Sequence, residues 1–293
     1  MIEHTNKSDI KNTKFKKFAA VFYDNKTGMV GLYIIIFFLL IAFIGPLIYK
    51  YDPQSFGSGG LIAPPTKGFP LGTDDMGRDI LGALIYGAKV SLLIGIFATL
   101  ISVFIGTVIG TISGFTGGKL DIILMRLTDS FMVLPRLPLI LILAALLGPS
   151  TKNIIIVLGL TSWTGTARLV RSQTLSVKER QFVERAISAG AGKAYIMFRH
   201  ILPNVFPIIF SNTVLVAASA ILTETTLSFI GLGDPMTPSW GQILRGAFVS
   251  GAISLNAWWF FVPAGLSVIF LVLGFTFLGY SLDEIFNPKL RSR

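Results

Sequence analysis

Six stretches of this sequence are apolar for long enough to cross a lipid bilayer, and this feature restricts the chain to one structural class. A helix needs about 20 consecutive apolar residues to cross the hydrocarbon core. The stretches together with their loops use up the 293 residues, so no soluble domain of ordinary size fits beside them. The sequence therefore predicts an all-α polytopic membrane protein with six transmembrane helices. The expected spans are 29–49, 88–115, 124–147, 153–175, 205–230 and 257–282.

The basic residues are distributed unevenly between the loops. The formal net charge is +10, which could indicate nucleic-acid binding, but Lys and Arg are roughly threefold more frequent in loops of one parity. The positive-inside rule explains this bias and makes a nucleic-acid partner unnecessary. It predicts cytoplasmic tails at 1–28 and 283–293, an extracytoplasmic loop at 50–87, and a cytosolic position for residues 178–204.

A charged segment punctuated by glycine, residues 178–207, separates the fourth and fifth spans. Its pattern predicts an amphipathic helix over 178–189 that ends at Gly190 as the residue after the C-cap. A second short helix is expected over 193–200. Pro203 and Pro207 then stand where a new membrane helix can begin. A polar segment between two spans is typical of a docking surface for a cytosolic partner.

The interior of this segment carries no nucleotide-binding loop. Gly190 to Lys193 resembles the end of the phosphate-binding pattern G-x-x-x-x-G-K-[ST], but the first glycine would fall at Ile187 and the last position is Ala194. We therefore expect that the chain itself does not bind ATP. In the predicted 178–189 helix, Phe182, Ala186 and Ala189 share one face.

An acidic cluster precedes the second span. Asp74, Asp75 and Asp79 lie close to Arg78 in the extracytoplasmic loop. One interpretation is a docking surface or a mouth that attracts cations. The other is helix capping, in which Thr73 or Asp74 begins the helix and carboxylates favour its N-terminus.

The remaining ionisable residues give no sign of an enzyme. Glu224 is a carboxylate inside an apolar run, so it either lines an outer vestibule or pairs with a neighbour. Asp129 is expected to pair locally with Arg126. His200 and the distant His4 make no metal site, and no catalytic set of side chains is visible. We therefore expect neither a cofactor nor catalysis.

A line of small residues in the second span predicts close helix packing. Ser102, Gly106, Gly110 and Gly114 recur every four residues and so lie on one side of a helix. The partner can be another helix of the same chain or of a second subunit.

Several motifs together resemble a known family. The pattern Glu184-Arg-Ala-x3-Gly190-x9-His200-x-Leu202-Pro203 resembles the EAA signature of ABC importer permeases. Arg185 departs from it by replacing the first alanine, and His200 stands where the general signature has isoleucine. Five further segments resemble the C-type permease of the dipeptide/oligopeptide/nickel branch: 71–81, 162–186, 190–204, 227–233 and 238–244.

This resemblance implies a type I ABC importer permease fold with core 88–282. It implies a second permease, two cytosolic ATPases, an extracytoplasmic binding protein and a place in the bacterial cytoplasmic membrane with both termini inside. Peptides, nickel or a metal chelate would be the cargo. Alternatives from other classes are a stand-alone secondary transporter and a membrane scaffold with a cytosolic docking helix.

The resemblance also assigns site residues, with a coupling helix within 182–197 seated on one ATPase. The implied contacts to the ATPase are Phe182, Glu184, Arg185, Ala186, Ala189, Gly190, Lys193, His200 and Pro203. The candidates for the pathway or for docking of the binding protein are Asp74, Asp75, Arg78, Asp79, Glu224 and Trp240.

Overall fold

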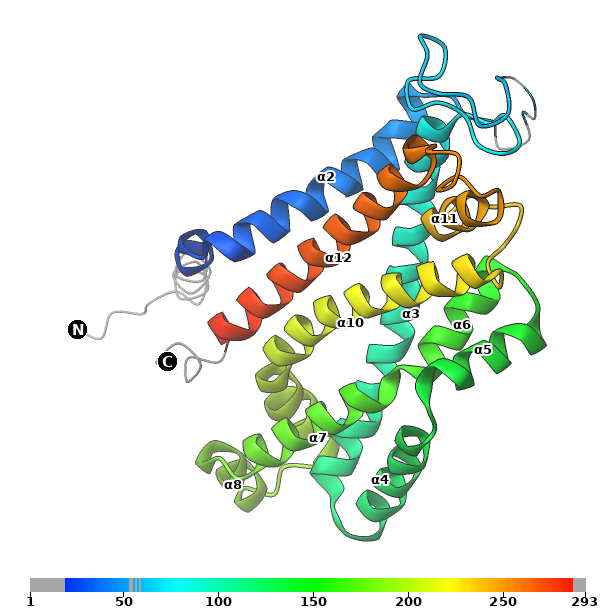
Figure 1. Ribbon diagram of the computed structural model, residues 1–293. Helices are drawn as coiled ribbons and strands as arrows, with labels where there is room; N and C mark the ends of the chain where they lie inside the picture. The colour runs from blue at the N-terminus through cyan, green and yellow to red at the C-terminus, as the bar shows by residue number, and fades with distance from the viewer. Residues whose placement is uncertain (1–18, 53–54, 56, 58, 287–293) are drawn as a thin grey trace.

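The computed structural model describes residues 19–52, 55, 57 and 59–286, and this part of the chain is mostly helical (Figure 1). Expectations for 1–18 and 287–293, which include most of both tails, lie outside the described residues. Five stretches are long and apolar enough to cross a membrane, or six if one bent pair counts as a single span. The expected six-span, all-α architecture is thereby confirmed.

The helices follow the apolar runs, with differences at their ends. The long ones are α2 (Lys26–Ile48), α3 (Ile80–Thr116), α10 (Leu202–Ile230) and α12 (Trp258–Phe286); the others are α4 (Gly118–Val133), α5 (Arg136–Leu147), α6 (Thr151–Thr161), α7 (Trp163–Lys178), α8 (Gln181–Ser188), α9 (Lys193–Ile196), the π-helical turn η1 (Met197–Ile201) and α11 (Trp240–Val249).

Helix α3 is the central element against which the others pack. It begins at Ile80, eight residues before the expected start, because the Asp79 carboxylate accepts hydrogen bonds from the amides of Leu81 and Gly82. With 37 residues it is about 55 Å long and exceeds the bilayer core. Three clusters of buried apolar side chains surround it.

The small-residue line on α3 packs against α7 of the same chain. A Cβ added at Gly106 would lie 2.7 Å from the carbonyl oxygen of Trp163, and one at Gly110 would collide with the carbonyl of Ala167. Backbone atoms of the two helices are therefore in direct contact, which side chains larger than hydrogen would prevent. Of the two partners that the sequence allowed, a helix of the same chain or of a second subunit, the structure shows a helix of the same chain.

The third span is bent, which differs from the straight helix expected over 124–147. Helices α4 and α5 meet at an angle of 87°. Leu134 has an extended backbone because Pro135 follows it, and the residue before a proline is disfavoured in the α region. The fourth span has a milder interruption at Ser162, between α6 and α7.

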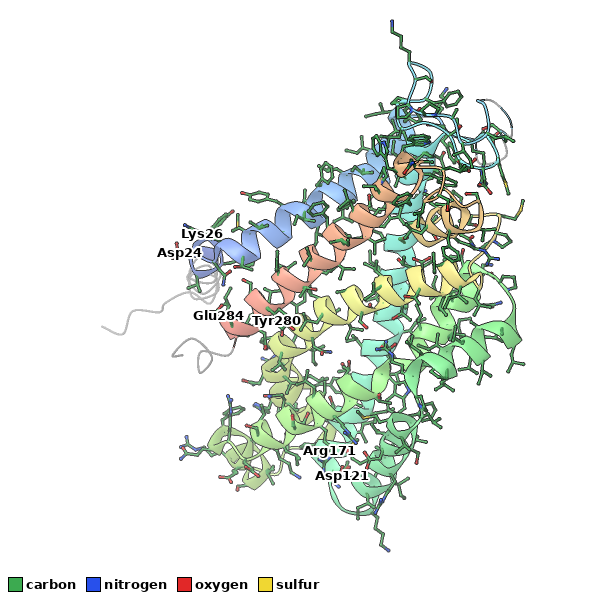
Figure 2. All side chains as sticks on the ribbon, in the orientation of Figure 1. Asp24, Lys26, Asp121, Arg171, Tyr280 and Glu284 are labelled. Carbon is green, nitrogen blue, oxygen red and sulfur yellow. The ribbon has the colours of Figure 1, made fainter. Side chains whose placement is uncertain are left out.

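The two ends of the bundle carry different structures (Figure 1). Helix α8 lies at one end, here called the α8 end; α11 and the loop before α3 lie at the other, here called the α11 end. Helix α2 begins and α12 ends near each other, and Asn25 Nδ2 donates to Glu284 Oε2 at 3.1 Å. Figure 2 shows this pairing of ends through the labelled neighbours Lys26 and Glu284.

Candidate functional site

The helix expected in the polar segment is present as α8, and Gly190 ends it. Gly190 has φ +79°, its amide donates to the carbonyl of Ile187 at 2.9 Å, and the amide of Ala191 donates to Ala186 at 3.0 Å. These two bonds form a Schellman motif, which requires the left-handed conformation that glycine adopts readily. Helix α8 is shorter than predicted, since Lys178 belongs to α7 and Ala189 is the C-cap.

The buried face of α8 is formed by Val183. Val183 is 0% exposed, whereas Phe182 is 38% exposed and Ala189 also faces outward. Val183 packs with Ile196 and other residues of the cluster beneath, and Ala186 lies partly against it. Of the three residues expected to share one face, Phe182 and Ala189 are exposed and Ala186 is half-buried. Phe182 and Ala189 contribute to the outer surface.

An aromatic group forms beside α8. His200 lies between Phe182, at 6.0 Å between ring centroids, and Tyr195, at 5.7 Å. Tyr195 and Ile187 are largely exposed, and sequence reasoning did not single them out. The contact joins residues from three different elements, α8, α9 and η1. Spacing within the sequence therefore gave little signal for it beyond the position of Tyr195 two residues after Lys193.

The charged residues of the segment face outward. Glu184, Arg185 and Lys193 are exposed on α8 and at the start of α9. Ile187 on the same helix is also exposed. The segment thus presents side chains of both charge signs and an apolar side chain to the outside.

Two polar contacts fix the base of this segment. Lys178 Nζ donates to the carbonyl of Phe115 at the end of α3, at 2.8 Å. Arg171 forms an ion pair with Asp121 of α4 through two hydrogen bonds of 2.7 Å. Figure 2 labels the two residues, which lie close together. Asp121 also accepts from Ser113 of α3. The end of α7 is therefore tied to α3 and α4.

A further ion pair at this end corrects a local prediction. Asp129 of α4 pairs with Arg168 of α7 at 2.6 Å, not with Arg126 three residues before it. This non-local bond also holds α7 against α4.

Pro203 stands at the start of α10, as expected, and Pro207 lies inside that helix. The chain runs without a break from Lys193 through the π turn η1 into α10, and Pro203 is in the first turn of α10. In the π turn the amide of Leu202 bonds to the carbonyl of Met197, one residue farther back than in an α-helix. This shift lies directly before Pro203, which has no amide proton to donate to the preceding turn. The carbonyl of His200 accepts from Asn204 Nδ2 at 2.7 Å.

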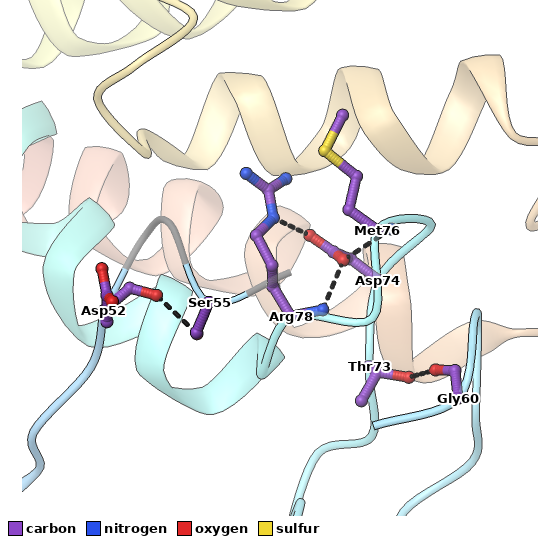
Figure 3. Close-up of polar contacts among 7 residues, drawn as sticks. All are labelled: Asp52, Ser55, Gly60, Thr73, Asp74, Met76 and Arg78. Atoms are coloured by element: carbon purple, nitrogen blue, oxygen red, sulfur yellow. Dashed lines mark hydrogen bonds and ion pairs between the residues drawn. The ribbon is translucent and has the colours of Figure 1, made fainter. Parts of the chain in front are cut away.

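At the α11 end, Asp74 serves the loop itself. Its carboxylate accepts from the amides of Met76 and Arg78 at 2.9 and 2.8 Å, and from Arg78 Nε at 2.6 Å (Figure 3). Thr73 donates to the carbonyl of Gly60 across the loop. A carboxylate of the acidic cluster caps α3, as the capping interpretation predicted. The residue is Asp79, however, and not Thr73 or Asp74.

Asp75 lines a cavity together with Asp74 and Arg78 of the same cluster. A cavity of about 630 Å³ lies between this loop and α11, lined by Asp75, Arg78, Gln242 and Arg245 among others. Burial raises the pKa of the Asp75 carboxyl, and the neighbouring charge of Asp74 raises this pKa further. The structure therefore keeps Asp75, with Arg78, among the candidates for docking.

Trp240 and Glu224 are core residues. Trp240 is 1% exposed, and its indole donates to the carbonyl of Leu84 at 3.0 Å. Glu224 is 0% exposed and accepts hydrogen bonds from Ser228 at 2.8 Å and from Ser91 of α3 at 3.2 Å. Because both side chains are buried in this chain, neither is available on its surface to contact a binding protein. Glu224 pairs with its neighbours, which was one of the two alternatives.

Comparison with known proteins agrees with this arrangement. Residues 106–292 match the family described as "Binding-protein-dependent transport system inner membrane component", and residues 13–65 match the "N-terminal TM domain of oligopeptide transport permease C".

Curated relatives match along most of their own length. The oligopeptide transport system permease protein OppC of Bacillus subtilis (strain 168) is 36% identical over 271 residues, which cover 92% of this chain and 88% of that protein. The dipeptide transport system permease protein DppC of Haemophilus influenzae is 35% identical, covering 95% and 96%. The di/tripeptide transport system permease protein DppC of Pseudomonas aeruginosa is 34% identical, covering 94% and 93%. Multiple apolar helices and these matches identify a multi-pass protein of the cell membrane. The chain therefore belongs to the binding-protein-dependent transport system inner membrane components, the permease subunits of ABC importers.

Proposed function

We propose that this chain forms, with a second permease, the membrane pathway of an ATP-driven importer for peptides delivered by an extracytoplasmic binding protein. Its membership of the permease family supports this proposal. The similar proteins are named for oligopeptides, dipeptides and di/tripeptides, and these names favour peptides over nickel or a metal chelate as cargo.

In this proposal the α8 end faces the cytosol and couples the pathway to one of two ATPases. The observation that carries this assignment is the combination of a rigid base and an exposed tip in one short helix. Gly190 closes α8, and Val183 is buried beneath it. Glu184 and Arg185 remain exposed. Movement of a bound ATPase would thus shift α8 as a unit and pass through the continuous helix from Lys193 to Ile230.

The other end of the bundle would then be extracytoplasmic, with both termini in the cytosol. The roughly threefold bias of basic residues supports this orientation. The cavity between Asp75 and Arg245 would face the binding protein.

A stand-alone transporter or a scaffold is less well supported. A secondary transporter couples to ions through intramembrane charges, but Glu224 is fully buried and bonded to Ser91 and Ser228. A scaffold would not require the transport-component match over residues 106–292.

The experiment compares two variants of the complete importer, co-expressed with its cognate second permease, ATPases and binding protein. The double variant Glu184→Lys/Gly190→Ala changes the exposed charge and the backbone closure of α8. Lys119→Glu is the matched control, because Lys119 is an exposed residue at the same end but outside the segment. Retention of the ATPases during affinity purification and ATP-dependent peptide uptake are measured together.

We expect the double variant to lose most of its bound ATPase and uptake, while Lys119→Glu keeps both. If the double variant retains its ATPases and transports normally, the coupling assignment is wrong. If the complete wild-type importer takes up no peptide, the proposed cargo is wrong.

A further inference from the structure

Arg136 is a cationic side chain at the bend of the third span. It is the first residue of α5, directly after Pro135. Its guanidinium donates to Ser162 Oγ at 2.8 Å and to Ser219 Oγ at 3.4 Å. Within the described residues, no carboxylate lies at ion-pair distance from this guanidinium. The charge is therefore held in place by neutral groups.

The three residues of this contact lie at a similar distance from the α11 end of the bundle. Arg136, Ser162 and Ser219 each lie about eleven residues from the α11 end of their helices α5, α6–α7 and α10. At 1.5 Å per residue this is roughly 16 Å, about half the thickness of the hydrocarbon core. In Figure 1 the α4–α5 bend lies beside the α6–α7 junction.

The charge belongs to a strip of polar side chains. Ser219, Asn212 and Thr223 of α10 are separated by seven and four residues, so they lie on one side of that helix. Asn212 Nδ2 donates to Thr166 Oγ1 of α7 at 3.0 Å. Ser162, Asn212 and Ser219 are only partly buried in the isolated chain. Polar groups at this depth face a water-filled path or protein, and not lipid.

The guanidinium retains donors for a ligand. Arginine carries five N–H groups in a planar fork, and the two hydroxyl contacts use two of them. Arg136 is an exposed residue of the isolated chain, and among the described residues its guanidinium bonds only to these two hydroxyls. A fixed guanidinium with free donors in a medium of low dielectric constant matches a carboxylate, which it binds through two parallel hydrogen bonds.

We propose that Arg136 is a carboxylate-binding point on the wall of the transport pathway, where it holds the carboxylate of a passing peptide substrate. This inference rests on the proposed function and adds the chemical group that the pathway recognises. The hydroxyls of Ser162 and Ser219 position the guanidinium across two helix interruptions. The carboxylate belongs either to the C-terminus of the peptide or to an acidic side chain.

The test measures initial uptake by the complete importer in proteoliposomes. Three sets of substrates are compared. The first set contains peptides of two to five residues with neutral side chains and a free C-terminus. The second contains the same peptides as C-terminal amides, and the third contains amides that carry one glutamate. The variants are Arg136→Gln, Arg136→Lys, and Arg126→Gln as a matched control on α4 outside the strip. The uptake rate of each variant is divided by the wild-type rate for the same peptide, so that selection by the binding protein cancels. Thermal unfolding and co-purification of the partners verify that each variant assembles.

We expect Arg136→Gln to lower uptake of free-acid peptides about tenfold, which corresponds to one charge-assisted hydrogen-bonded contact. Uptake of the neutral amides should change less than twofold. Arg136→Lys should recover part of the loss, and Arg126→Gln should have no effect. Loss of uptake for the glutamate-bearing amides as well would show that the site accepts side-chain carboxylates.

An equal loss for acids and amides would overturn the proposal, because it would mean that Arg136 is structural or pairs with a carboxylate of the second permease. Unchanged uptake of free acids by Arg136→Gln would also overturn it. Both results differ from failure of the proposed function, in which wild type itself would import no peptide.

Discussion

Glu224 connects two helices through a carboxyl group that has no contact with solvent. Its two oxygens accept from Ser228 and from Ser91, which joins α10 to α3. A buried carboxylate is tolerated only when such donors satisfy it. Truncation would remove both bonds and leave a cavity.

We therefore expect Glu224→Ala to destabilise the chain by about 2–4 kcal/mol. The melting temperature of the detergent-purified chain should fall by several degrees. Thr226→Ala, at a half-buried residue two positions along the same helix whose hydroxyl bonds, among the described residues, only to the carbonyl of Leu222, should change it far less. A melting temperature of Glu224→Ala equal to wild type would show that the two serine contacts contribute nothing.

The Asp75 carboxyl makes stability depend on pH. Its pKa in the folded chain is raised by burial and by Asp74, so folding favours the neutral form. The stability associated with this group is complete at low pH and is lost as pH rises through the folded pKa. The affected window begins near pH 4, the usual range of aspartate.

The variant Asp75→Asn stays neutral at every pH and isolates this effect. Its melting temperature should exceed that of wild type at pH 8 by on the order of 1 °C. The difference should shrink toward zero as the pH falls to 4. A difference that is constant or grows on acidification would contradict the raised pKa.

At the scale of elements, α3 and α7 are held by backbone contact, and two glycines allow a matched test. A methyl group at Gly110 would collide with the carbonyl of Ala167, whereas one at Gly165 in α7 would meet no atom within 4 Å. Gly110→Ala should therefore destabilise the chain by about 1–3 kcal/mol through overpacking. Gly165→Ala should be neutral or stabilise by up to about 1 kcal/mol, because alanine is the better helix former. Equal melting temperatures for the two variants would refute this packing.

Local patterns in the sequence were sufficient for some elements and insufficient for others. The spans follow from the length of the apolar runs, and the end of α8 follows from Gly190, because both depend on nearby residues. The inner face of α8 could not be read from eight residues, since Val183 is buried by Ile196, which comes later in the chain. The pair Asp129–Arg168 likewise joins two helices, and sequence spacing favoured the nearer Arg126.

The start of α3 and the bend of the third span show a similar limit. Thr73, Asp74 and Asp79 are all suitable caps, and only the folded loop decides that Asp79 performs this role. Pro135 marks a possible break, but the angle of 87° depends on what the two halves pack against. The position of Arg136 at a junction of three helices depends on the same packing.

At the scale of the whole molecule, the proposed orientation can be tested directly because the sequence contains no cysteine. Single substitutions Lys119→Cys and Met236→Cys place thiols on exposed residues at the α8 end and the α11 end, respectively. In intact cells stripped of any outer barrier, an impermeant maleimide should label Met236→Cys only. Lys119→Cys should react only after the membrane is permeabilised. The reverse labelling pattern would invert the orientation.

The bend between α4 and α5 has a consequence for biogenesis. Helix α5 has 12 residues and is about 18 Å long, which is too short to cross a core of about 30 Å alone. Where the bent pair forms one span, residues 118–147 must therefore enter the membrane as a single segment. The hydroxyls that hold Arg136, on Ser162 and Ser219, leave the ribosome later. The third span thus enters the membrane before its bend can be stabilised, and it acquires its final shape only when the later helices arrive.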